Sequence, residues 1–460
     1  MSGLVRPPHS FASPALHAGT LALTKAGVPT SNESDVFVVK LTNAGSPVWA
    51  QRVGGSDSES VDGMAVVGNA VYLTGSFESS SLALGNATLA NAGGSDVFVA
   101  KLLDAGPTST VSWAMQAGGP GLDQVSGLAV SGSSVYLTGA FTQPAAFGAT
   151  TLNPGTAGRE DLFVAKVTDA GSSGAFAWAM WGGSTARTFA RSLAVAGSSV
   201  YVAGEFSGST ATFGPVVLTN AGSTTSTDLF VAKLTDAGST GEFDWSMRAG
   251  GPGYDNADAV AVQGTAVYLG GHFDGATAAF GSTTLANSGP LGTSDICLAR
   301  LTDAGSTGRF DWTQVGGSTG SDYCRSLAIR GTSVRVGGSV RVPATFGSQV
   351  LVARVGGGLS GVSFFAGLTD ATLTAVQPAQ PTVGVELFPN PAHGTATVRL
   401  SAIAGPATFT ILDVLGRTLR TQTATATAKA ELDLTGLTPG YYAVHVSVGT
   451  SNATQWLMVE

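Results

Sequence analysis

The sequence predicts an all-β protein, in which a β-propeller of about six blades, each a four-stranded antiparallel sheet, precedes an immunoglobulin-like β-sandwich. Three observations lead to this prediction. A strand-like word recurs at intervals of 54 to 67 residues, and no stretch of the chain shows helical periodicity. The last 76 residues then leave the repeat for a different alternating pattern.

The repeated word is clearest at residues 161–171, which read DLFVAKVTDAG. Related words begin at Asp35, Asp96, Asp228 and Asp295, and a degraded sixth copy (VLVARVGGG) is expected from Val350. A recurrence at this scale is typical of repeat architectures. The basic residues that end the apolar run are separated by 61, 65, 67, 67 and 54 residues; they are Lys40, Lys101, Lys166, Lys233, Arg300 and Arg354.

Each repeat supplies four to five short strands. In the third repeat the first strand is residues 161–167, the second surrounds Trp178, and the third and fourth are 192–196 and 200–206. A further short segment covers 212–218. The first strand is apolar on both faces, as in a strand buried on both sides, and Gly, Ser and Asp supply tight turns. One such sheet per repeat favours a propeller. A β-helix has shorter coils, and a sandwich does not explain the repetition.

The domain boundaries follow from where the repeat begins and ends. The propeller is predicted over residues 1–366, with repeats starting near 35, 96, 161, 228, 295 and 349 and a part-repeat at 1–34. Residues 367–384 lose the pattern and read as a linker, and 385–460 form the second domain.

The N-terminal part-repeat resembles the end of a repeat, a fourth strand and its following segment. This strand could complete the last sheet and close a six-bladed ring, although Pro7 and Pro8 cannot donate to a ladder. The rival explanation is that the chain starts within a repeat. Residues 1–10 lack the apolar stretch of a secretory signal, and a signal peptide is expected upstream.

Composition excludes several classes of protein. Charged residues make up 11% of the chain and the net charge is −8, which argues against nucleic-acid binding. No apolar run approaches the roughly 18 residues of a membrane span. Cys297 and Cys324 have no spacing typical of disulfides or metal sites and are expected to be buried and apolar. No cofactor is expected, apart from calcium as an alternative.

The words DxFVAKL, Trp, Gly-Gly, LAV and VYLTG, in this order, resemble the SBBP-type β-propeller repeat. The resemblance covers roughly residues 35–351, and it implies a propeller fold. The repeats here are longer than is usual for that family, because of the FG-x-x-x-L segment after the fourth strand.

Three words near the C-terminus are more specific: LFPNPA from Leu387, ILDVLGR from Ile411 and LTGLTPGYYAV from Leu434. They resemble the type A C-terminal sorting domain of the Bacteroidetes type IX secretion system. The resemblance implies contact with the type IX machinery, passage across the outer membrane, and a final location outside the cell or on its surface. The motif residues are Pro389, Asn390, Pro391, Gly416, Arg417, Pro439, Gly440, Tyr441 and Tyr442.

Two acidic series recur with the repeat. An Asp begins each first strand, at 35, 96, 161, 228 and 295. A second acid lies nine residues before the Gly that ends the third strand, at Glu59, Asp123, Asp255 and Asp322, with Thr188 in the third repeat. Carboxylates suit Ca²⁺, so the second series supplies calcium candidates. The favoured interpretation is that each acid accepts backbone N–H bonds in its own turn, because a turn needs one copy per repeat.

Catalytic patterns are missing from the sequence. The five histidines are scattered, His272 is expected to face solvent, and no nucleophile–base pattern occurs. No carboxylate pair can be nominated outside the repeated series, so no catalytic residue is assigned. The predicted function is a secreted or surface-bound binding module for an unknown protein or glycan. The alternatives are a glycan hydrolase or lyase and a structural spacer. Candidates for a ligand face lie where the repeats differ: Trp181, Arg187, Arg191, Tyr254, Asp274 and Tyr323.

Overall fold

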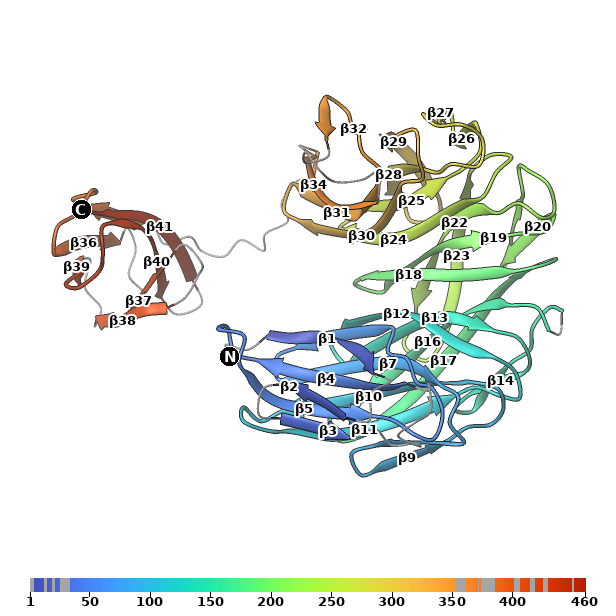
Figure 1. The fold of residues 1–460 in the computed structure, drawn as a ribbon, viewed down its shortest axis with the longest axis horizontal. Coiled ribbons are helices and arrows are strands. Elements are labelled where there is room, and N and C mark those ends of the chain that lie inside the picture. The colour runs from blue at the N-terminus through green and yellow to red at the C-terminus, as the bar shows by residue number, and fades with distance from the viewer. Residues whose placement is uncertain are drawn as a thin grey trace. The chain divides into compact units, whose positions relative to one another are not determined.

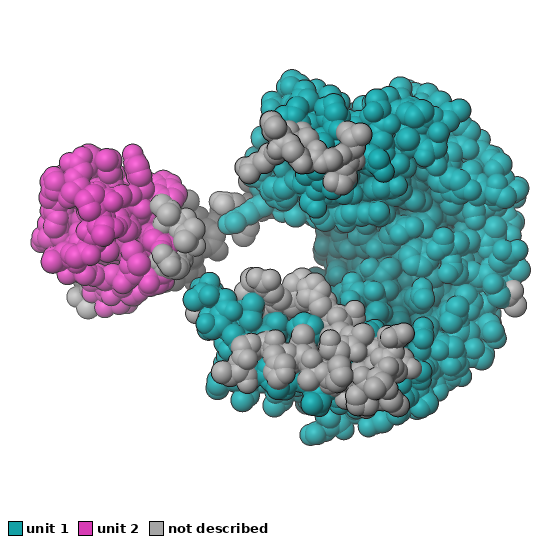
Figure 2. Space-filling model, viewed as in Figure 1, with its two compact units in different colours: residues 1–373 teal, residues 374–460 magenta. Residues whose placement is uncertain are grey.

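The structure is a computed structural model, which describes residues 4–11, 15–18, 21–24, 34–156, 158–352, 361–370, 372–373, 385–400, 406–413, 418–424, 429–448 and 451–460. Two compact units are present, Met1–Leu373 (unit 1) and Thr374–Glu460 (unit 2) (Figure 2). Every regular element in the described residues is a β-strand, and the sheets are antiparallel. The all-β prediction is therefore confirmed.

Unit 1 contains four sheets that share one strand order, which we number sheets 2 to 5. Each takes the third and fourth strands of one repeat and the first and second strands of the next. The sheets are therefore offset by half a repeat from the predicted units. Sheet 2 is β6 (Gly63–Val67), β7 (Ala70–Phe77), β10 (Asp96–Asp104) and β11 (Ser109–Ala117); sheet 3 is β12 (Asp123–Ser131), β13 (Ser134–Phe141), β16 (Asp161–Asp169) and β17 (Gly174–Ser184). Sheet 4 is β18 (Thr188–Ala196), β19 (Ser199–Phe206), β22 (Asp228–Asp236) and β23 (Gly241–Ala249); sheet 5 is β24 (Asp255–Gln263), β25 (Ala266–Phe273), β28 (Asp295–Asp303) and β29 (Gly308–Gly317).

Three-stranded sheets flank this series. Sheet 1 is β1 (Leu4–Phe11), β4 (Asp35–Leu41) and β5 (Pro47–Val53), and sheet 6 is β30 (Tyr323–Arg330), β31 (Ser333–Val340) and β34 (Val362–Thr369). The third strands β6, β12, β18, β24 and β30 contact their neighbours in turn and form the inner edges of their sheets. In Figure 1 the sheets follow one another along a curve in chain order.

Strand β1 pairs with β4, from Leu4 opposite Leu41 to Phe11 opposite Asp35. The prediction that this strand completes the last sheet is therefore wrong. Every fourth strand in the described chain pairs with the first strand that follows it, and β1 obeys the same rule. The register shifts between Arg6 and His9, where Pro7 and Pro8 lie, so the irregularity accommodates two residues that cannot donate.

The sixth copy of the repeated word was also misplaced. Val350 lies in a short hairpin strand, β33 (Gln349–Leu351), and the true sixth first strand is β34. Val362 lies opposite Val340 as Asp295 lies opposite Phe273. The spacing agrees, because Asp370 follows Asp303 by 67 residues, as Asp303 follows Asp236. Unit 1 therefore includes the first residues of the predicted linker.

A hairpin links each fourth strand to the next first strand in the described chain, and from sheet 2 onward it also pairs with the preceding sheet. Hairpin β20 (Thr210–Phe213) and β21 (Val216–Thr219) pairs with β17 of sheet 3, through Gly183 opposite Thr212. The fully buried Phe213 meanwhile packs on Phe230 of sheet 4, with ring centroids 4.7 Å apart. The hairpin thus connects two sheets. The other hairpins are formed by five strand pairs: β2 (Ala15–Ala18) with β3 (Leu21–Thr24), β8 (Ser81–Leu84) with β9 (Ala87–Ala90), β14 (Ala145–Phe147) with β15 (Thr150–Leu152), β26 (Thr277–Phe280) with β27 (Thr283–Ala286), and β32 (Ala344–Phe346) with β33.

An aspartate whose side chain is at most 10% exposed joins each pair of neighbouring sheets. Asp169 of sheet 3 accepts hydrogen bonds from Lys101 (2.6 Å), Tyr72 (2.6 Å) and Trp113 (3.0 Å), all of sheet 2. Burial disfavours its charge, but these bonds and the N–H of Gly171 outweigh burial and lower the pKa of Asp169 to about 2. The charged ends of the repeated word therefore hold sheets together. Equivalent residues are Asp104, Asp236, Asp303 and Asp370.

Unit 2 has two sheets around one apolar core. One is β35 (Val385–Phe388), β36 (Thr395–Leu400) and β39 (Lys429–Asp433); the other is β38 (Thr418–Ala424), β37 (Ala407–Leu412), β40 (Gly440–Val448) and β41 (Ser451–Val459). Alternation decides the buried face: in β37, Ala407, Phe409 and Ile411 are buried and the residues between them are not. The immunoglobulin-like topology stays a prediction.

Candidate functional site

Residues that differ between repeats gather near the starts of the inner strands β18, β24 and β30. We call this group the inner-strand cluster. Three of its members, Arg187, Arg191 and Tyr323, were predicted from the sequence as ligand candidates, and the structure brings them together with five others. The full cluster is Arg187, Phe189, Arg191, Glu205, Asp258, His272, Tyr323 and Arg325.

A two-pronged ion pair lies at the centre of the cluster. Arg191 on β18 donates from Nε to Oε2 of Glu205 at 2.6 Å and from Nη2 to Oε1 at 2.9 Å. The same Nε lies 3.7 Å from Oδ1 of Asp258 on the neighbouring sheet. Glu205 is 1% exposed, and burial raises its pKa while the charge of Arg191 opposes that rise. A guanidinium and a carboxylate joined by two such hydrogen bonds attract each other by charge and also hold each other in one orientation.

His272 contradicts the sequence-based expectation of a solvent-facing side chain. It is 8% exposed, and its Nδ1 lies 2.8 Å from Oδ2 of Asp258. Tyr323 from sheet 6 meets its ring edge-on, with centroids 4.8 Å apart. The expectation was wrong because contacts between neighbouring inner strands bury a position that one repeat alone leaves open.

Two aromatic side chains support the arginines. The guanidinium carbons of Arg187 and Arg191 lie 5.0 and 5.5 Å from the ring centre of Phe189, and that of Arg325 lies 4.7 Å from Tyr323. The side chains of Arg187 and Arg325 are 44% and 55% exposed. The cluster therefore presents accessible guanidinium donors above buried carboxylates, which suits recognition of a polar or anionic ligand.

A polar hollow of about 350 Å³ adjoins the cluster through Phe189. The segment before β6, together with β7, β12 and β18, lines it with hydroxyl, amide and carboxylate groups. Its remaining lining residues are Ser60, Asp62, Ser76, Gln124, Val125 and Ser126.

Sequence reasoning missed Phe189, Glu205, Asp258 and Arg325. A signal was available, because one position of the third strand reads Asp62, Ser126, Arg191, Asp258 and Arg325 through five successive repeats. When one position differs in residue type from repeat to repeat, the repeated fold does not require a particular side chain there. The other predicted ligand residues lie outside the cluster as described: Trp181 and Tyr254 are 39% and 54% exposed, and Asp274 accepts from the backbone N–H of Tyr254.

The acidic series occupy turns, as the favoured interpretation expects. Asp96 accepts the N–H of Ala92 at 3.0 Å, and Asp123 accepts that of Gly119 at 2.7 Å. Equivalent backbone bonds reach Glu59 at 3.0 Å, Asp255 at 2.6 Å and Asp322 at 2.6 Å. Each acid therefore fixes the loop before its own strand.

The two series also meet within a repeat. The carboxylates of Asp96 and Asp123 both lie against the α-carbon of Gly118, where a β-carbon would clash with them. Burial, with the nearby charge of Asp96, raises the pKa of Asp123 to about 7. Burial likewise raises the pKa of Glu59 to about 7 and of Asp255 to about 8. Among the described residues no group of three or more potential metal ligands occurs, and calcium binding stays a prediction.

Both cysteines are buried free thiols in the described fold, Cys297 on β28 and Cys324 on β30. Burial raises the pKa of Cys324 to about 12 and that of Cys297 well above its ordinary value. Thiols held in this protonated form are poor nucleophiles.

The PNP motif of unit 2 is hydrogen-bonded to the last strand, β41, through Asn390. Asn390 donates from Nδ2 to the carbonyl of Trp456 and accepts the N–H of Met458 at Oδ1, both at 2.8 Å. At the third word, Tyr442 is buried and its hydroxyl donates to the carbonyl of Thr438 at 2.6 Å, whereas Tyr441 is 61% exposed. Pro389, Pro391 and Pro439 are exposed, Gly440 is half-buried and begins β40, and Gly416 and Arg417 lie outside the described residues.

Residues 386–460 match the family model described as secretion system C-terminal sorting domain. Unit 2 contains a secretion sorting domain. The predicted resemblance of this part of the chain is therefore confirmed. Within the sorting domain, Asn390 holds the N-terminal segment against the C-terminal strand, and Tyr442 on β40 bonds to the turn before that strand.

Comparison with solved structures adds no argument about unit 1. A fungal alcohol oxidase of the AA5 family, in complex with copper, matches over 100% of both chains with 10% identity and a TM-score of 0.24. Dimeric latent PorU from Porphyromonas gingivalis matches 93% of this chain and 31% of that chain, with 10% identity and a TM-score of 0.16. Comparison with curated proteins found no match. Helices long and apolar enough to span a membrane are absent from the described residues.

Proposed function

We propose that this chain is a non-enzymatic binding or adhesion protein, exported by the type IX secretion system to the cell surface or the medium. The observation that carries this proposal is the sorting domain at residues 386–460. In this proposal the sorting domain is an immunoglobulin-like sandwich that contacts the secretion machinery, and unit 1 is the cargo that acts outside the cell.

Unit 1 is, in this proposal, a six-bladed propeller built from SBBP-type repeats. Six antiparallel sheets in chain order, joined through their inner strands and through buried aspartates, support it. Propellers present variable residues on a repeated frame. The inner-strand cluster is the proposed ligand-binding site, since its residues differ from repeat to repeat and it keeps Arg187 and Arg325 accessible.

A glycan hydrolase or lyase is the second candidate, favoured by one observation. Glu205 and Asp258 are carboxylates outside the two repeated acidic series, and both approach Arg191. Glycoside hydrolysis needs one carboxylic acid and one carboxylate that both reach the substrate. Here Glu205 is held by Arg191 and Asp258 by His272, and both acids are buried, which supports binding over catalysis.

Export can be tested by appending residues 374–460 to a periplasm-directed reporter protein in a host with the type IX system. We expect the reporter outside the cell, and the same reporter without these residues in the periplasm. Retention of both reporters in the periplasm would contradict the export half of the proposal.

Ligand binding can be tested by screening the full chain against glycan and matrix-protein arrays. The double variant Arg187→Ala/Arg325→Ala should lose at least tenfold in affinity for any ligand found, because it removes the accessible guanidinium groups. The matched control is Arg309→Ala, which removes an arginine that is 78% exposed and lies on β29 rather than on an inner strand. Equal binding by both variants would place the ligand elsewhere, and no binding at all would favour the spacer alternative.

A further inference from the structure

Sheet 6 stops one strand short of the sheets before it. In sheets 2 to 5 the first strand is covered on its outer side by a second strand, β11, β17, β23 or β29. Each covering strand carries a tryptophan at the same register, Trp113, Trp178, Trp245 or Trp312. In the described structure β34 is the outer strand of sheet 6, so its outer backbone edge has no partner strand there.

Within the described residues, the face of β34 that points away from sheet 5 is also uncovered, because Phe364 packs toward sheet 5 and Phe365 alternates to the other side. Phe365 lies opposite Gly337 as Leu298 lies opposite Gly270, so the two positions are equivalent. Leu298 is 6% exposed and its counterparts in sheets 2 to 4 are fully buried, whereas Phe365 is 74% exposed. The strand, VSFFAGLT, contains no lysine or proline. An apolar edge without such residues is prone to pair with another strand.

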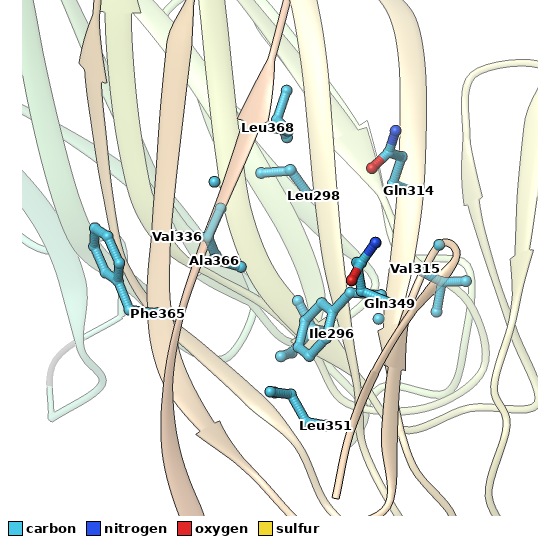
Figure 3. A pocket seen from close by; sticks show the side chains of 14 residues that line it. Ile296, Leu298, Gln314, Val315, Val336, Gln349, Leu351, Phe365, Ala366 and Leu368 are labelled. Carbon is cyan, nitrogen blue, oxygen red and sulfur yellow. The ribbon is translucent and has the colours of Figure 1, made fainter.

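An apolar hollow of about 310 Å³ lies beside this edge, between sheets 5 and 6. Figure 3 shows Ile296, Leu298, Val315 and Leu351 around it, with the side-chain amides of Gln314 and Gln349 close by, whereas the ring of Phe365 is directed away on the other side of its strand. The hollow and the unpaired edge coincide, so one extended chain could fill the first with side chains and satisfy the second with its backbone.

We propose that β34 binds an extended segment of another polypeptide as a fourth antiparallel strand, with a tryptophan near the middle of that segment. The four covering strands of this same chain define that chemistry. Their tryptophans lie opposite Lys101, Lys166, Lys233 and Arg300, and the residue of β34 at this register is Gly367.

The register also determines which side chain the tryptophan of the bound segment would contact. In sheets 2 to 5 each tryptophan packs on a tyrosine of the fourth strand, as Trp312 does on Tyr268 with ring centroids 5.9 Å apart. Arg335 takes the tyrosine position in sheet 6, and its guanidinium now lies 5.9 Å from the ring of Phe365. A bound tryptophan would stack on this guanidinium, a favourable cation–π contact. A small apolar molecule would fill the hollow but leave the backbone edge unpaired.

The probe for the test is a labelled synthetic peptide with the sequence of residues 241–250, GEFDWSMRAG. We expect saturable binding to the full chain by fluorescence anisotropy, with one peptide per chain by calorimetry. A peptide with serine in place of tryptophan should bind at least tenfold more weakly. Phe365→Glu should also weaken binding at least tenfold, and Val217→Glu, at a residue 59% exposed on a hairpin, should leave it unchanged.

Circular dichroism and thermal unfolding of Phe365→Glu must match the unsubstituted protein, and Phe365→Ser serves if the charged variant misfolds. Absence of saturable peptide binding, or equal binding by the Phe365 variants, would overturn the proposal. A dimer in light scattering that Phe365→Glu dissociates, without peptide binding, would overturn it in favour of a second copy as occupant. The peptide site on β34 is separate from the inner-strand cluster. A negative result for one proposed site therefore leaves the proposal for the other site open to its own test.

Discussion

At the scale of single residues, the same amino acid has opposite roles at the two ends of the repeated word. Asp161 begins a strand, where burial raises its pKa, and Asp169 ends it, where donors from the preceding sheet outweigh burial and lower its pKa to about 2. Local sequence does not distinguish these cases. The difference comes from whether another sheet brings donors to the carboxylate.

Asp169→Asn tests the role of these buried aspartates. It leaves Lys101, whose side chain is 9% exposed, without its counter-charge, so we expect the free energy of unfolding to fall by about 3 kcal/mol. Denaturant unfolding of the full chain measures the change. Glu242→Gln, at an exposed residue, is the control and should change the same quantity by less than about 0.5 kcal/mol. Equal effects of the two substitutions would refute the role.

The carboxylates with raised pKa values predict that the free energy of unfolding depends on pH. The pKa values of Glu59, Asp123 and Asp255 are about 7, 7 and 8 in the fold, against about 4 in an unfolded chain. The folded state then binds more protons, so the free energy of unfolding should fall as pH rises from about 4 to about 8. Asp169, with its lowered pKa, is ionised in the fold throughout that window, and it adds a slope of opposite sign only below about pH 5, where the unfolded chain takes up its proton. Asp123→Asn should flatten the slope in urea titrations, and an unchanged slope would argue against a buried protonated Asp123.

The same acids allow a test of whether the protein binds calcium. If they serve only their turns, millimolar calcium or EDTA should leave the melting temperature unchanged in a thermal shift assay. A rise with calcium that Asp123→Asn abolishes, and that the control Asp57→Asn retains, would instead identify a cation site at Asp96 and Asp123. Asp57 is an exposed carboxylate outside the pair and so matches the charge change.

At the scale of elements, the hairpin after each fourth strand is a link between sheets rather than an extra strand. Sequence reasoning recognised the FG-x-x-x-L segment but had no means of assigning its contacts, because it pairs with one sheet and packs its phenylalanine into the next. Elements of this kind stabilise the order of the sheets as well as each sheet.

Phe213→Ala tests this link. It removes a fully buried ring that packs on both Phe230 and Phe243, and we expect unfolding to become easier by about 3–5 kcal/mol. Val217→Ala, on the exposed side of the same hairpin, is the matched control and should cost less than about 0.5 kcal/mol. If both variants behave alike in chemical denaturation, the hairpin does not hold the sheets together.

At the scale of the molecule, unit 1 is a series of similar sheets in which each complete sheet draws strands from two repeats. No single sequence repeat can form such a sheet alone. Cooperativity across the series is therefore expected, because each sheet shares its chain and its buried aspartates with its neighbours.

Phe147→Ala and Phe280→Ala, in separate hairpins, test that cooperativity. Both side chains are 1% exposed, and neither contacts the other's partners among the described ring pairs. Their effects on the free energy of unfolding should add within about 0.5 kcal/mol in the double variant. Both should also lower the same calorimetric transition. Separate transitions for the two variants would show that the sheets unfold independently.

The sequence by itself determined the all-β character, the repeat and the sorting domain, because these rest on local alternation, turn residues and short words. Tertiary structure decided the rest. The half-repeat offset of the sheets, the place of β34 as the sixth first strand and the burial of His272 all depend on which strands pair and which sheets touch. Those choices are made by contacts between residues about 14 to 100 positions apart, which no local pattern encodes.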